Sequence, residues 1–191
     1  MAAWLGGILA TFAVCFAPLL FVSDPNWKVW GFVAAYQITW CAAESAFALR
    51  YRGVGSSGKH DLFPGMHGLA AFLFTGFANF ACAMGGPIDP GFLVTAVVCG
   101  VVGLILRCWS IATLKQHFRD TIDFTSNQTV ITSGPYRFLK HPAELGFLFL
   151  LFGISLVAGK WALIFFGIVM VPFSIARMIL ENRLLRRFGK V

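Results

Sequence analysis

Six apolar runs dominate the sequence and limit the folds open to it. They cover residues 3–22, 29–49, 66–85, 91–113, 146–158 and 161–180. A helix that crosses the hydrocarbon core of a bilayer needs about 20 apolar residues, and all but the fifth run approach this length. Only 12% of the residues are charged, whereas a typical soluble domain has about 25%. The chain is therefore predicted to be an all-α integral membrane protein, a bundle of about five to six transmembrane helices.

The whole chain, residues 1–191, is predicted to form a single membrane domain. The last two apolar runs are joined only by Gly159 and Lys160, so they are expected to form a helical hairpin. Pro172 is expected to kink the second helix of this hairpin. The first run is interpreted as a retained helix rather than a signal peptide, because no basic segment precedes it. The domain thus comprises N-terminal helices in residues 1–113 and a loop, hairpin and tail in residues 114–191.

Lysine and arginine gather on alternate connections between the apolar runs. Segment 50–63 contains three, segment 114–143 contains four and the tail after Arg177 contains four, while the intervening connections contain one, none and one. Basic loops stay on the cytoplasmic side of a membrane, so a multi-pass protein with both termini and the 114–143 loop in the cytoplasm is predicted. This orientation explains the net charge of +7 without a nucleic-acid partner. The 114–143 loop and the tail should therefore share one membrane face and be able to meet.

Glutamate and cysteine are the residues inside the apolar runs whose side chains could have a chemical role. Glu44 is an acid within the second run, where a charge is costly unless it is paired or near the interface. Interfacial or structural pairing is the preferred interpretation, and a functional role is the alternative. All five cysteines lie in apolar runs without a Cys-x-x-Cys pair. They are interpreted as small buried hydrophobes, and no metal site is expected.

The polar segment 133–146, here called the island, combines turn residues with side chains suited to chemistry. His141 precedes Pro142, which favours a turn, and Glu144 then opens the next helix. The first turn of a helix has unpaired N–H groups that suit an anionic group. In the tail, Arg177 and Glu181 share a helix face and could hold a carboxylate and an amine or ribose, respectively. Alternatively, they form an ordinary surface pair and His141 only caps the turn.

The island also carries a sequence signature. The stretch Val-Ile-Thr-Ser-Gly-Pro-Tyr-Arg at 130–137, followed by Lys-His-Pro at 140–142 and Leu-Gly at 145–146, resembles the signature of the isoprenylcysteine carboxyl methyltransferase family, which includes phospholipid N-methyltransferase relatives. A second block, Arg177, Glu181 and Phe188-Gly189, looks like the family's C-terminal helix. The chain has Gln128 where the family has histidine and Glu144 where it has tyrosine.

The resemblance implies a membrane methyltransferase that uses S-adenosyl-L-methionine, leaves S-adenosylhomocysteine as product, and takes a lipophilic substrate from the lipid membrane. Arg177 would be the catalytic residue that holds or orients the acceptor group. The residues that would contact the cofactor come from the loop, the island and the tail: Gln128, Thr129, Val130, Ile131, Tyr136, His141, Pro142, Ala143, Glu144 and Glu181. No metal is needed, because methyl transfer from a sulfonium is an in-line displacement that depends mainly on alignment.

The sequence does not decide which group accepts the methyl, and two other classes of protein are alternatives. Methylation of an isoprenylcysteine carboxyl is the family default, but an acid at Glu144 would also suit an amine, and a thiol is a further option. The first alternative class is an NADPH-dependent membrane reductase of the sterol type, which has a similar arrangement of C-terminal helices. The second is a non-catalytic membrane protein or small transporter. S-adenosylhomocysteine and NADPH binding would separate these classes.

Overall fold

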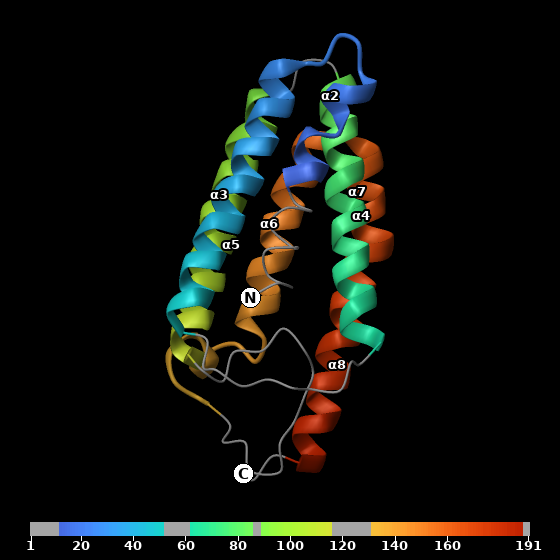
Figure 1. The fold of residues 1–191 in the computed structure, drawn as a ribbon. Helices are drawn as coiled ribbons and strands as arrows, with labels where there is room; N and C mark the ends of the chain where they lie inside the picture. Colours follow the sequence, from blue (N-terminus) through green and yellow to red (C-terminus); the bar gives the residue numbers. More distant parts are fainter. Residues whose placement is uncertain (1–11, 52–61, 86–88, 116–130, 189–191) are drawn as a thin grey trace.

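The protein is all-helical over the residues described by a computed structural model, which are 12–51, 62–85, 89–115 and 131–188 (Figure 1). The elements are α2 (Pro18–Phe21), α3 (Trp27–Tyr51), α4 (Leu62–Met84), α5 (Pro90–Leu114), the 3-10 turn η2 (Gly134–Arg137), α6 (Pro142–Ala158), α7 (Lys160–Phe165), the π-helical segment η3 (Phe166–Met170) and α8 (Val171–Phe188). The all-α prediction is confirmed for this part of the chain.

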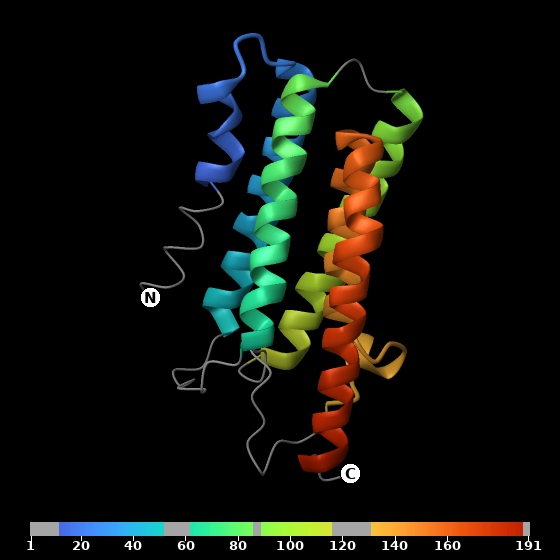
Figure 2. The ribbon, with the colours of Figure 1, turned by 90° about the vertical axis from the view of Figure 1, so that its right-hand side faces the viewer.

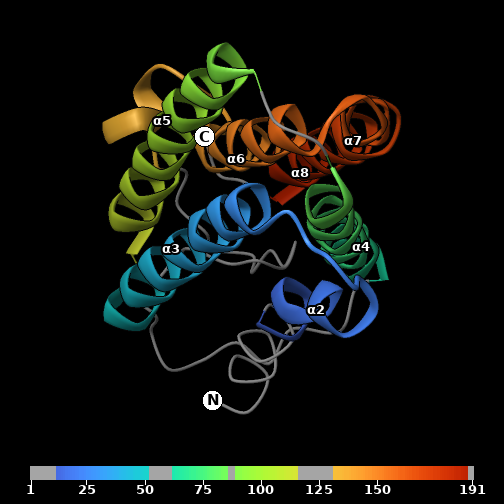
Figure 3. The same cartoon turned by 90° about the horizontal axis from the view of Figure 1, so that it is seen from above.

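The long helices lie side by side in one bundle (Figures 1 and 3). The most extensive contact joins α5 to α6, and α3 packs against α5 while α4 packs against α6 and α7. Figure 2 shows α2 on the flank of the bundle formed by α3 and α4. Helices α3, α5 and α8 end, and α4 and α6 begin, at the same end of the bundle. The segments predicted to share a membrane face therefore lie at one end, here called the site end.

The first apolar run is interrupted in its described part. Residues 12–16 are helical, Ala17 forms a turn, and Pro18 begins the short helix α2. Proline has no N–H to donate to the preceding turn, so it fits the first position of a new helix better than the interior of one. The apolar helix nevertheless runs over Phe12–Phe21, with a local irregularity at Ala17. Residues 1–11 lie outside the described part, so the full span over 3–22 stays a prediction.

The C-terminal hairpin forms as predicted, but its first helix is longer than expected. α6 begins at Pro142 rather than at Gly146, because proline is compatible with the first helical turn and Glu144 is favourable there. Gly159 adopts φ 91°, a conformation that favours glycine, and this permits the tight connection to α7. Pro172, the predicted kink site, is the second residue of α8 and follows η3 directly. Proline cannot donate a backbone hydrogen bond to the preceding turn, and the wider π-helical turn of η3 accommodates this loss.

Two glycines allow α5 and α6 to approach closely. A Cβ atom on Gly103 would lie 2.7 Å from the carbonyl oxygen of Gly146, and a Cβ on Gly146 would lie 2.7 Å from the carbonyl oxygen of Gly103. These distances are too short for any side chain, so small residues at both positions let the two backbones touch. This contact lies at the site end and brings the last turns of α5 to the start of α6.

In the described part of the chain, two segments are long and apolar enough to cross a membrane, Pro90–Leu114 and Lys160–Arg183. Shorter apolar helices cover Phe12–Phe21, Leu69–Met84 and Pro142–Ala158. α3 is not among them and carries the polar residues Gln37 and Glu44. Large apolar side chains on the outside of α5, including Val94, Val98 and Ile105, are exposed, as expected for a surface that faces lipid. The total of five to six transmembrane helices therefore remains a prediction.

Candidate functional site

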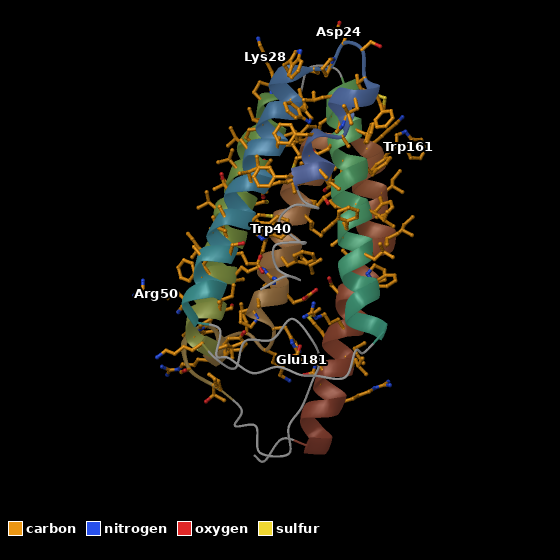
Figure 4. All side chains as sticks on the ribbon, in the orientation of Figure 1. Asp24, Lys28, Trp40, Arg50, Trp161 and Glu181 are labelled. Carbon is orange, nitrogen blue, oxygen red and sulfur yellow. The ribbon has the colours of Figure 1, made fainter. Side chains whose placement is uncertain are left out.

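Ionisable side chains gather at the site end of the bundle. Arg50 and Glu181 lie at this end, whereas Asp24, Lys28 and Trp161 lie at the other (Figure 4). The site end joins the ends of α3 and α5, the start of α6 and the middle of α8. Residues far apart in the sequence therefore meet here, and their contacts define the candidate site.

The island is fixed against α5 by its first turn. Gly134 has φ 59°, and a Cβ atom there would lie 2.6 Å from the hydroxyl oxygen of Thr113 on α5. The position therefore requires glycine for both its backbone conformation and its packing. Tyr136 follows in η2 and interacts with Ser110 of α5, and burial raises the pKa of Tyr136 to about 12. Its phenol is thus a neutral group at neutral pH, able to donate or accept a hydrogen bond.

His141 links the end of the island to α8. Its Nδ1 lies 3.1 Å from Oε2 of Glu181, and this hydrogen bond is the main cause of a His141 pKa raised above 6.5. The side chain does not cap α6, although His141 occupies the N-cap position. Its Nε2 is buried and has no hydrogen-bond partner of standard geometry among the residues that the structure describes. The ring is also close enough to Asn182 of α8 for a side-chain interaction that adds to the raised pKa, so α8 holds His141 through two residues.

Arg177 and Glu144 form a second link between α8 and the island. Arg177 Nη1 lies 3.8 Å from Glu144 Oε2, and the Glu144 side chain is only 9% exposed. Because Arg177 and Glu181 lie four positions apart, they lie on one face of α8. That face meets the start of α6 through both residues. The prediction that the island and the tail meet is confirmed for these residues.

A third ion pair joins α3 to α5 beside the island. Glu44 accepts hydrogen bonds from Nε and Nη2 of Arg107, the former at 2.8 Å, and from Nε1 of Trp40 at 2.7 Å. Arg107 Nη1 also donates to the carbonyl oxygen of Ala143 at 3.2 Å. The preferred interpretation of Glu44 as a paired acid is confirmed. Arg107 is absent from the predicted site, although an arginine inside an apolar run gives the same kind of signal as Glu44.

The structure brings together most of the predicted site residues that it describes. His141, Pro142, Ala143 and Glu144 form the start of α6, and Arg177 and Glu181 contact this segment from α8. Tyr136 lies next to α5, and Ile131 is half-buried in the irregular segment before η2. The predicted residues Gln128, Thr129 and Val130 lie outside the described part of the chain.

Ionisable groups that are buried and paired within apolar helices mark candidate functional sites. A family model described as phospholipid methyltransferase matches residues 92–190, just over half of the chain. The chain belongs to the phospholipid methyltransferase family, which confirms the resemblance seen in the sequence. The matched segment includes the island, α6 and α8, and therefore every predicted site residue. Neither the comparison with curated proteins nor that with solved structures gave a match.

Proposed function

We propose that this protein is an S-adenosylmethionine-dependent methyltransferase that acts on a lipophilic substrate taken from the membrane. The observation that carries the proposal is the double link between α8 and the island, His141–Glu181 and Arg177–Glu144. Both links lie within the segment that matches the methyltransferase family. They assemble, at one end of an apolar bundle, the residue types that a sulfonium cofactor with carboxylate, amine and hydroxyl groups requires.

The residues present fit such a cofactor. His141 is held at the start of α6 by Glu181 and Asn182, and the first turn of α6, which has no side-chain cap, suits a carboxylate. Glu181 is 41% exposed, so its carboxylate can accept hydrogen bonds from ribose hydroxyls or an amine. Tyr136 offers a neutral hydroxyl and an aromatic face from the α5 side. Tyr136 is close enough to Glu181 for a charge interaction, and Glu181 contacts His141.

When bound, the cofactor would supply an activated methyl group on a sulfonium sulfur. The protein's part is to align the acceptor with this methyl group and to exclude water, because in-line displacement depends on geometry. The acceptor atom forms the new bond to carbon, and the electron pair of the broken carbon–sulfur bond stays on sulfur. Arg177, held at the start of α6 by Glu144, is placed to orient the acceptor, which is its proposed catalytic role.

The contact between Arg177 and Glu144 influences which chemical group the enzyme would methylate, a carboxylate or an amine. A substrate carboxylate, such as that of an isoprenylcysteine, would compete with Glu144 for Arg177. An amine would instead find a carboxylate ready to accept its proton after methylation. Carboxyl and amine acceptors both fit the proposal, and this contact favours the amine. The NADPH-dependent reductase gains no comparable support, because the family match is to methyltransferases.

The same proposal places the site end on the cytoplasmic face of a multi-pass protein. The segments richest in lysine and arginine adjoin this end, in keeping with the positive-inside rule. A reporter enzyme active only in the cytoplasm, fused after Val191, is expected to be active. Activity only from a reporter that requires the opposite side of the membrane would contradict the proposed orientation.

The proposed function is tested by ligand-induced stabilisation of the purified protein. S-adenosylhomocysteine at 100 times its Kd should raise the free energy of unfolding by about 2.7 kcal/mol, and NADPH at the same concentration should have no effect. Stabilisation by NADPH alone would point to the reductase. No response to S-adenosylhomocysteine or S-adenosylmethionine would overturn the methyltransferase proposal.

A further inference from the structure

Glu44 lies outside the segment that matches the family, yet it contacts the site. It is on α3, in the part of the chain before residue 92. Both of its carboxylate oxygens bind the Arg107 guanidinium, and Oε2 also accepts a hydrogen bond from the Trp40 indole. A carboxylate with three charge-assisted or buried hydrogen bonds is held in one orientation. Glu44 therefore fixes where the guanidinium of Arg107 lies.

Arg107 in turn contacts the first two turns of α6, one residue in each. Its Nη1 donates to the carbonyl oxygen of Ala143, and its guanidinium carbon lies 5.4 Å from the ring centroid of Phe147. The Phe147 ring lies 5.7 Å from the ring of Trp40, which closes a ring of contacts through Glu44, Arg107, Phe147 and Trp40. Three helices, α3, α5 and α6, are joined at this point.

The part of α6 held in this way is the part that carries the site. Ala143 lies between His141, which contacts Glu181, and Glu144, which contacts Arg177. A shift of the Ala143 carbonyl would move both neighbours, because all three belong to one turn. Displacements on the order of 1 Å in a catalytic site can lower rates about 100-fold. The orientation of Arg107 is therefore linked to the geometry of both contacts with α8.

We infer that Glu44 is a positioning residue of the active site, which acts through Arg107 to hold the first turn of α6 in place. The inference rests on the proposed function, because it gives Glu44 a part in methyl transfer. Its mechanical part, that Glu44 orders the first turn of α6, concerns the protein alone and has a measurement of its own.

The test compares Glu44→Gln, which keeps the size of the side chain and removes its charge, with Asp24→Asn, the same change at an exposed position at the other end of the bundle. Hydrogen exchange should become at least several-fold faster at residues 143–147 in Glu44→Gln and stay unchanged in Asp24→Asn. The Kd for S-adenosylhomocysteine should rise about 10-fold to 100-fold, the scale seen when an outer residue that orients a ligand-binding group is lost. Unchanged exchange at residues 143–147 would overturn the inference.

A double variant separates positioning from simple stabilisation. In Glu44→Gln/Arg107→Met, no buried charge is left without its partner, so the thermal stability should recover much of the loss caused by Glu44→Gln alone. The contact with Ala143 is still absent, so cofactor affinity and kcat should stay low. Recovery of stability, affinity and kcat together would show that the pair only stabilises the fold and would overturn the inference.

These outcomes are distinct from failure of the proposed function. If the wild-type protein does not bind S-adenosylhomocysteine, the proposed function fails, whereas the exchange measurement on residues 143–147 still decides whether Glu44 orders this turn. If the wild-type protein binds the cofactor and Glu44→Gln binds it equally well with normal kcat, the proposed function stands and the positioning role fails.

Discussion

Arg177 on α8 lies 3.8 Å from Glu144 in the first turn of α6, and both side chains are largely buried. The contact joins two segments that the sequence separates by more than thirty residues. It also places a guanidinium and a carboxylate together within the proposed methyltransferase site. The two residues therefore offer the most direct way to examine the chemistry of the site.

Replacement of Arg177 by alanine should abolish most methyl transfer. The loss should be about 100-fold in kcat/KM, the scale found when a preorganised electrostatic group is removed from an active site. Arg177→Lys should retain more activity, since the charge persists without the two-pronged geometry. Arg183→Ala, an exposed position on the same helix, serves as the control and should stay near wild type. Equal losses in Arg177→Ala and Arg183→Ala would contradict the proposed role.

Glu144→Gln distinguishes an amine acceptor from a carboxyl acceptor. With an amine, the substitution removes the carboxylate that would take the proton, so the rate should fall. With a carboxylate substrate, the same change removes a competitor for Arg177, so the rate should hold or rise. The measurement compares methyl transfer to a lipophilic amine and to a prenylated cysteine. An unchanged rate of amine methylation in the variant would contradict the assignment of an amine as the acceptor.

Much of this arrangement can be read from the sequence, but not all of it. Run length gives the helices within a few residues, and the distribution of basic residues gives the shared end of the island and the tail. The pairing of Glu44 with Arg107 is not readable in this way, because each apolar run reveals its own polar residue but not which helix lies next to it. That neighbourhood depends on tertiary packing, above all on the backbone contact between Gly103 and Gly146.

The link between His141 and Glu181 should make stability depend on pH. The hydrogen bond with Glu181 raises the pKa of His141 above 6.5 in the folded protein, so the folded state binds the proton more tightly than the unfolded state. The stabilisation is fully present below pH 6.5 and is lost as pH rises through the folded pKa. Thermal unfolding of wild type and His141→Gln, measured from pH 5.5 to 9, should show a decline with pH that is smaller in the variant.

Glu181→Gln provides the matched control for this pH dependence. It removes the charge that raises the His141 pKa, so the extra decline should disappear even though the histidine is still present. The titration of the His141 ring, followed by NMR, should move down in the same variant. An identical pH dependence in wild type, His141→Gln and Glu181→Gln would rule out the link.

A buried amide pair inside the bundle should contribute to stability independently of the site. Asn79 Nδ2 donates to Gln37 Oε1 at 2.8 Å, and the thiol of Cys15 donates to the same oxygen at 2.9 Å. Asn79→Ala would leave a buried amide with one partner fewer, at a cost of about 1–3 kcal/mol. Thr95→Ala, which removes an exposed hydroxyl that bonds Gly91, is the control and should cost far less. Similar unfolding midpoints for the two variants would contradict this account.

The close approach of α5 and α6 predicts that Gly146→Ala damages both stability and activity. The new Cβ would lie 2.7 Å from the carbonyl oxygen of Gly103, so the helices must move apart, at a cost of about 1–3 kcal/mol. Separation would also draw Arg107 away from Ala143 and lower cofactor affinity. Gly31→Ala is the matched control, because nothing lies within 4 Å of its new Cβ and alanine favours a helix by about 0.5–1 kcal/mol. If both variants raise the unfolding temperature, the two backbones do not touch as described.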